Sequence, residues 1–177
     1  MDETPEGPPV KAKLAAFLAL MILIAPASAA EIRVEGAQMS RDFACEDGQD
    51  VSISGAGHKV VLTGRCGAVN VHGADHIVSF ETAREIAVSG IANTVEGGTT
   101  GGLVVETAKN KVKATVKAAE TAKIDVSGAD QKLELTLAGP TQIEVQGAKN
   151  AVEWRAEAGI KAPSVSAGGV ENRISRR

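Results

Sequence analysis

Hydrophobic and polar residues alternate along most of this chain, in short runs that a glycine interrupts. The clearest run begins at Val51 and reads V-S-I-S-G-A-G-H-K-V-V-L. Its phrase, apolar-x-apolar-x-Gly-x-x-(Asn or His)-x-apolar, returns about every 17 to 21 residues. Alternation with a period of two is typical of a strand with one buried face. The Gly-x-x-Asn spacer is typical of a turn, because Gly supplies a positive φ and Asn tolerates the left-handed region.

One position of the repeat is almost always an amide or an imidazole. Two architectures fit strand–turn–strand units, an antiparallel meander and a solenoid in which each repeat is one coil. In a parallel β-helix, equivalent side chains stack about 4.8 Å apart and amides bond along the column, whereas a meander gives no reason to repeat an amide. The pattern therefore predicts an all-β parallel β-helix (β-solenoid) of about seven to eight short coils. The predicted ladder residues are His58, His76, Asn93, Asn110, Gln131, Asn150 and Asn172.

Composition limits what can fill such a coil. Apolar residues make up 44% of the chain and aromatic residues only 2%, so the core must consist of Val, Ile, Leu and Ala. These residues suit a narrow two- or three-sided coil. Trp154 follows Val152 at an inward-facing position, which favours a place in the core. The net charge of -3 gives no electrostatic basis for binding nucleic acid, and no such partner is expected.

The N-terminal segment is typical of an export signal. Lys11 and Lys13 precede an apolar run from Leu14 to Ile24, and Ala27-Ser28-Ala29 forms a small-residue cleavage pattern. A membrane span needs roughly 20 apolar residues, more than this run provides. We expect a periplasmic or secreted protein that is not embedded in the membrane after signal cleavage. The acidic segment before Val10 is unusual for a signal peptide, which leaves Val10 as an alternative start.

The domain organisation follows from the signal and the repeats. A first, degenerate phrase runs from Ile32 to Gly36, and the Met39–Cys45 stretch after it breaks the pattern. The predicted divisions are a signal-peptide helix at 1–29, an N-terminal cap with the first degenerate repeat at 30–50, and solenoid repeats at 51–177. Open ends of a solenoid invite aggregation unless they are guarded. Phe43 and the cap are expected to cover one end, and Arg173, Arg176 and Arg177 put charge on the other.

Two cysteines remain after the cleavage site. In an exported protein, Cys45 and Cys66 most simply form one disulfide, which would tie the cap to the adjacent coil. Two buried free thiols are the alternative.

The span Cys45–Val95 resembles the domain-of-unknown-function 3060 family of exported bacterial proteins. The resemblance rests on the two cysteines and on the V-x-G-x-x-N-x-V phrase, as in Val88-Ser89-Gly90-Ile91-Ala92-Asn93-Thr94-Val95. The usual N-T-V of the family is replaced here by His58-Lys59-Val60 and His76-Ile77-Val78. Looser units continue to Ile174. The resemblance implies an exported β-solenoid without a known activity, so it adds no catalytic residues.

The histidines are the first candidates for chemistry. His58 and His76 share the ladder position on adjacent repeats, and His72 lies four residues before His76, with Asp75 nearby. Imidazoles with a carboxylate can bind Zn²⁺ or Cu²⁺. A simpler interpretation is that His replaces Asn as the polar residue that caps the turn.

Carbohydrate chemistry is the second candidate, because many β-helices act on polysaccharides. Such catalysis needs clustered carboxylates, whereas the outward acids of this chain alternate with Lys and Thr. These acids are Glu81, Glu85, Glu106, Asp125, Glu134, Glu144 and Glu153. We therefore expect a structural or interaction module of the bacterial cell envelope, with an envelope polymer or a protein as partner, no cofactor and no catalysis. The alternatives are a metal- or glycan-binding solenoid and a polysaccharide-active enzyme.

Overall fold

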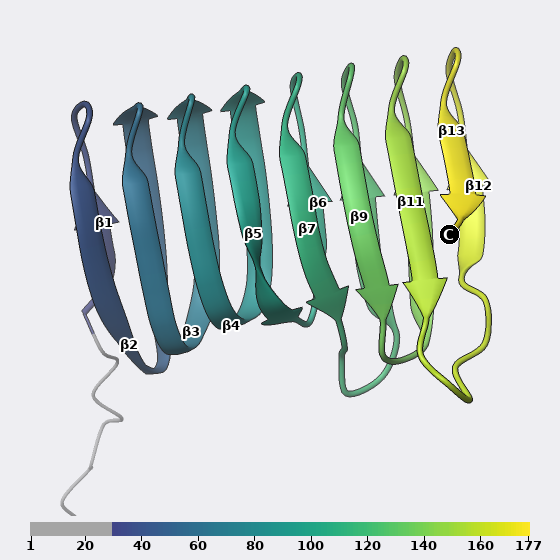
Figure 1. Cartoon of the computed structure of the whole chain (residues 1–177), viewed down its shortest axis with the longest axis horizontal. Coiled ribbons are helices and arrows are strands. Elements are labelled where there is room, and N and C mark those ends of the chain that lie inside the picture. Colours follow the sequence, from purple (N-terminus) through teal and green to yellow (C-terminus); the bar gives the residue numbers. More distant parts are fainter. Residues whose placement is uncertain (1–29) are drawn as a thin grey trace, which may run out of the picture.

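The computed structural model describes residues 30–177, and the predicted signal-peptide helix lies outside them. All regular structure in these residues is β-strand (Figure 1). The strands are β1 (Ile32–Val34), β2 (Ser40–Ala56), β3 (Lys59–Ala74), β4 (Ile77–Ile91), β5 (Thr94–Thr100), β6 (Leu103–Val105), β7 (Lys111–Val116), β8 (Ala122–Val126), β9 (Lys132–Leu137), β10 (Thr141–Val145), β11 (Ala151–Ala156), β12 (Ser164–Ala167) and β13 (Arg173–Arg176). The described part of the chain contains no helix long and apolar enough to cross a membrane.

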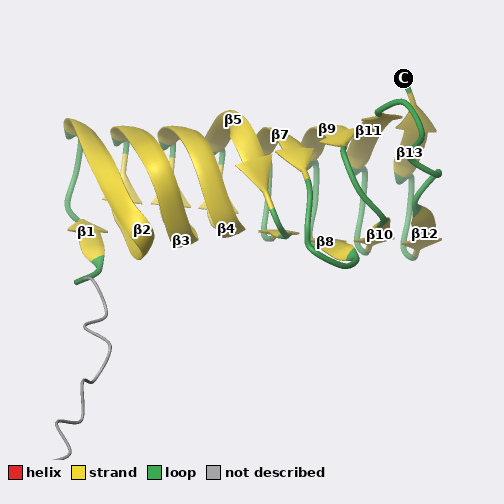
Figure 2. Cartoon of the chain, turned by 90° about the horizontal axis from the view of Figure 1, so that it is seen from below, coloured by secondary structure: helices red, strands yellow, loops and turns green. Residues whose placement is uncertain are grey.

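The strands form a parallel β-solenoid of about eight turns. Every ladder between named strands is parallel, so the predicted β-solenoid is confirmed and the antiparallel meander is wrong. Successive turns lie side by side along the long axis of the molecule (Figures 1 and 2).

Each turn has two sides. Side A consists of β1, the second halves of β2, β3 and β4, and then β6, β8, β10 and β12. Side B consists of the first halves of β2, β3 and β4, and then β5, β7, β9, β11 and β13. The three long strands bend from side B to side A without a break, as the broad curved ribbons show (Figure 2).

The core lies between the two sides and is built from the inward position of every second residue. In β9, Leu133, Leu135 and Leu137 are buried, whereas Lys132 and Glu134 are exposed. The same inward rows continue from turn to turn, because the strands pair in register. Period-two alternation thus places aliphatic side chains in continuous buried rows.

In the first turn, part of the predicted cap forms a strand. Ser40–Cys45, part of the stretch that breaks the hydrophobic pattern, belongs to β2 and pairs residue by residue with Lys59–Gly64 of the next turn. Arg41 pairs with Val60, whose side chain is buried, so Arg41 lies at an inward position. Within residues 30–177 this turn has a neighbouring turn on one side only, so its inward positions need not all be apolar. Partly buried Met39 and Phe43 pack against the end of the core there.

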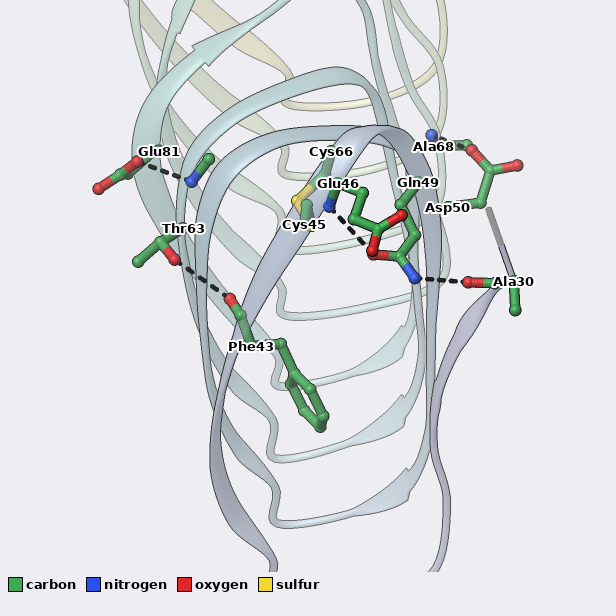
Figure 3. The surroundings of a disulfide bond; sticks show 11 residues. Ala30, Phe43, Cys45, Glu46, Gln49, Asp50, Thr63, Cys66, Ala68 and Glu81 are labelled. Carbon is green, nitrogen blue, oxygen red and sulfur yellow. Dashed lines mark hydrogen bonds between the residues drawn. A yellow bond between two sulfur atoms is a disulfide. The ribbon is translucent and has the colours of Figure 1, made fainter. Parts of the chain in front are cut away.

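The disulfide joins the first and second turns where β2 and β3 bend from side B to side A (Figure 3). Cys45 and Cys66 have their Cα atoms 5.1 Å apart, so the predicted disulfide is confirmed and the free-thiol alternative is wrong. Side chains also stabilise this corner: the Asp50 carboxylate accepts a hydrogen bond from the Ala68 N–H at 2.7 Å, and the Glu81 carboxylate accepts one from the Gly64 N–H at 2.8 Å.

Candidate functional site

The predicted ladder residues form one continuous column at the turn between side A and side B. The side chain of each column residue accepts a hydrogen bond from the backbone N–H of the equivalent residue one turn earlier, at 2.9–3.1 Å. The steps run Met39 to His58, His58 to His76, His76 to Asn93, Asn93 to Asn110, Asn110 to Gln131, Gln131 to Asn150 and Asn150 to Asn172. The column therefore connects all the turns.

The same side chains also close their own turns. The Asn93 amide donates to the carbonyl of Ser89, four residues earlier, and to the carbonyl of Gly73 on the preceding turn, both at 3.1 Å. Asn110 and Asn150 repeat this pair of bonds. Six of the column residues, from His58 to Asn150, are fully buried. Among residues 30–177, every buried side-chain nitrogen and oxygen has a hydrogen-bond partner.

The two buried histidines behave as substitutes for asparagine. His58 Nδ1 accepts from the Met39 N–H, and His76 Nδ1 accepts from the His58 N–H, both at 3.1 Å. Nε2 of each ring therefore carries the proton, and it donates to the carbonyls of Ser54 and His72 respectively. The rings stack with centroids 5.0 Å apart and planes 7° from parallel.

The His76 imidazole is held in the neutral form, because a proton on its Nδ1 would face the backbone N–H of His58. Burial lowers the pKa of the His76 imidazole below its usual value. Repulsion by His58 also lowers this pKa, whereas the carbonyls of His72 and Gly55 and the carboxylate of Asp75 raise it.

The third candidate metal ligand lies elsewhere. His72 is exposed on the outer surface of side A, where its Nδ1 hydrogen-bonds the Ser89 hydroxyl at 2.8 Å. The nitrogens of His58 and His76 are all engaged with backbone groups, so the three imidazoles do not converge on one point. The described residues contain no group of three or more His, Cys, Asp or Glu side chains placed to hold a metal ion.

The outward carboxylates are divided between the two sides. Glu106, Asp125 and Glu144 lie on or at the end of side A strands, whereas Glu134 and Glu153 lie on neighbouring strands of side B. Glu134 and Glu153 are brought together by Arg177, whose guanidinium contacts Glu134 at 3.0 Å and Glu153 at 3.7 Å.

A shallow hollow of about 270 Å³ lies beside this ion pair, on the outer surface of side B. Its polar lining comes from Lys113 and Thr115 of β7, Glu134 and Thr136 of β9, Glu153 and Arg155 of β11, and Arg177. The alternation of outward acids with Lys and Thr predicts a solvated strand face for Glu134 and Glu153 and gives no sign of the hollow. The signal available was the recurrence of charged or hydroxyl side chains two residues apart in three successive repeats.

Comparison of the chain with known protein families gives a match in the repeat region. One protein-family model matches residues 53–110. That family is DUF3060, described as a protein of unknown function. The resemblance predicted from the sequence is thus confirmed. The DUF3060 match contains the ladder residues from His58 to Asn110, and the same hydrogen-bonded column continues beyond the match to Asn172. No curated protein and no solved structure matches the chain.

Proposed function

We propose that this protein is an exported structural or interaction module of the bacterial cell envelope that acts without catalysis. The observation that carries the proposal is that the buried polar side chains of the ladder form hydrogen bonds within the protein. The ladder engages its imidazoles and amides in holding the turns together, which leaves the two outer sides as the surfaces open to a partner. Those sides present outward side chains in rows about 4.8 Å apart, the strand spacing of a parallel stack.

Two further features support export. The Cys45–Cys66 disulfide is of a kind that persists in the periplasm and outside the cell but is rare in the cytosol. The residues that precede Ala30 have the layout of a cleavable secretory signal. The expected partner is an envelope polymer or a protein that lies against one of the flat sides.

Export is tested by producing the full chain with a C-terminal tag in a bacterial host and fractionating the cells. We expect a mature N-terminus at Ala30 and two cysteines that resist alkylation until they are reduced. The control is a chain that starts with Met followed by Ala30, which should stay in the cytosol with alkylatable thiols. A full chain that is retained uncleaved in the cytosol would contradict export.

The interaction role is tested by sedimentation of the purified disulfide-bonded protein with isolated envelope fractions. We expect it to sediment with cell-wall or outer-membrane material and to leave the polysaccharides in that material intact. Release of reducing sugars from the same fractions would favour the polysaccharide-active enzyme instead. A protein that stays in the supernatant with every fraction would contradict the envelope role.

A further inference from the structure

The hollow on side B is bordered by two parallel rows of outward side chains. One row runs Lys113, Glu134, Glu153 across β7, β9 and β11, and the other runs Thr115, Thr136, Arg155 across the same strands. These three strands lie side by side (Figure 1). Members of a row are one strand spacing apart, about 4.8 Å, and the rows are two residues apart along the strands, roughly 7 Å.

A β-bulge shapes the N-terminal end of the hollow. The pairing of β5 with β7 shifts between Glu96 and Thr99, so that Gly97 and Gly98 together oppose Ala114. Two residues against one is the definition of a bulge, and bulges are frequent beside binding sites. Neither glycine has a side chain, and the residue of β5 that stands beside Thr115 at this end is Thr99, which can add one more hydroxyl to the row.

An arginine closes the other end. Arg177 follows Arg155 in the second row, since its backbone N–H bonds the Trp154 carbonyl at 2.8 Å. Its guanidinium crosses β11 to reach Glu134 of β9 and contacts Glu153 on the way. Exposed ion pairs add little stability, so the effect of these contacts is mainly to neutralise two carboxylates and fix the rim.

Two cations of the lining remain available. Within residues 30–177, neither Lys113 nor Arg155 forms an ion pair. The Arg155 Nε donates to the Thr136 hydroxyl at 2.9 Å, which orients the guanidinium along the row of hydroxyls. The lining has three cations and two carboxylates, a net charge of +1 from Lys113, Arg155, Arg177, Glu134 and Glu153.

We propose that this hollow binds a carboxylated sugar of an acidic polysaccharide. The planar fork of Arg155 matches a carboxylate, and Lys113 supplies a second positive charge. The hydroxyls of Thr115 and Thr136 donate to and accept from sugar hydroxyls. Because the lining of the hollow has a net charge of +1, it matches a single carboxylate better than it matches a dianionic phosphate.

The extended shape of the site fits a polymer. Sugar residues of a linear polysaccharide can lie along the solenoid axis, across β7, β9 and β11, and so meet one pair of side chains on each strand. Trp154 is buried beneath Arg176, so no aromatic face stacks on the sugar and contact with each residue is weak. The proposal rests on the envelope role and names the polymer chemistry and the surface that binds it.

The experiment is a titration of the purified disulfide-bonded protein with oligogalacturonate, with its methyl ester as the matched neutral ligand and with dextran sulfate as an unrelated polyanion. We expect oligogalacturonate to bind and the methyl ester to bind at least about tenfold more weakly, because the ester lacks the charge that Arg155 recognises. Arg155→Ala should weaken binding of oligogalacturonate about tenfold. Thr136→Val, which keeps the side-chain volume, should weaken it by a smaller factor.

Arg173→Ala is the matched control, because it removes an exposed arginine from β13, the strand that pairs with β11, but outside the hollow. It should leave the affinity within about twofold. Equal losses in Arg155→Ala and Arg173→Ala, equal binding of the methyl ester, or tighter binding of dextran sulfate would each overturn the proposal. So would a failure of oligogalacturonate to bind. In that case, continued sedimentation with envelope fractions would show that the envelope role survives and only the ligand assignment fails.

Discussion

A single ladder side chain forms several buried hydrogen bonds at once. The Asn93 amide accepts the His76 N–H and donates to two carbonyls and to the Asn110 amide oxygen, all inside the protein. Removing it would leave the His76 N–H and the Ser89 and Gly73 carbonyls without these partners. Buried groups without partners cost far more than a formed hydrogen bond contributes.

Asn93→Ala should therefore lower the free energy of unfolding by about 3–5 kcal/mol, since several buried groups lose a partner together. Urea denaturation followed by circular dichroism measures the change. Asn70→Ala is the control, because Asn70 is an exposed asparagine on side A and its loss should change stability by less than about 0.5 kcal/mol. Similar effects of the two substitutions would show that the column contributes little.

The burial of His76 makes stability depend on pH. Burial lowers the folded-state pKa of His76, so the unfolded chain binds this proton at higher pH than the folded chain does. Stability is then retained above the unfolded pKa of about 6.5 and lost as pH falls below it. His76→Asn restores the commoner ladder residue and removes the proton site.

We expect the parent protein to lose more stability than His76→Asn when pH is lowered from 7.5 to 5. Denaturant unfolding at both pH values measures the difference. The two proteins have the same carboxylates, so the contribution of these groups to the pH dependence largely cancels in the comparison. An equal loss in the two proteins would mean that His76 protonation does not oppose folding.

The turn elements repeat a backbone conformation as well as a side chain. The residue that opens each Gly-x-x-Asn turn has a positive φ, from 94° at Gly128 to 126° at Gly73. A Cβ at Gly128 would overlap the carbonyl oxygen of Thr107 on the preceding turn, so the position requires glycine. Thr107 is the exception: it occupies the same column with φ 76°, a conformation that a β-branched residue rarely adopts.

Thr107→Gly should raise the free energy of unfolding by about 1 kcal/mol, because relief of the strained φ exceeds the entropy that glycine adds to the unfolded chain. The reciprocal change, Gly128→Ala, should lower it by about 2 kcal/mol or more through strain and overlap. Thermal and urea unfolding of both variants give the values. A destabilised Thr107→Gly would contradict the assignment of strain.

The elements differ in how far the sequence determines them. Alternation and the repeated amide predicted the parallel coils, the inward rows such as Leu133 and Leu135, and the ladder. They missed the strand at Ser40–Cys45, because inward positions at an end turn face solvent on one side and lose the pattern. They also missed the Gly97–Gly98 bulge, which depends on the pairing of two turns, and with it the hollow that Arg177 closes from the terminal turn.

Residues 30–177 form a stack of turns, and the first and last turns of this stack do not match. At each internal step, the later turn offers a side-chain acceptor to the backbone N–H of the earlier one. At the first turn, Met39 holds the ladder position and Arg41 an inward position. If a second copy docked its Asn172 turn there, the Asn172 N–H would meet a thioether and inward Ile174 would meet a guanidinium. Inward charges on edge strands are a known protection against edge-to-edge association.

Removing this mismatch should cause end-to-end association. Met39→Asn with Arg41→Val supplies the amide acceptor and the inward valine that internal turns have, so copies should stack through the first and last turns. Sedimentation velocity over a range of concentrations should show a series of larger species that the parent protein lacks. Arg33→Val is the control, because it removes a charge and adds a valine on the outer surface of the same end turn. If the double variant matches the parent, or if Arg33→Val associates equally, then Met39 and Arg41 do not guard this end.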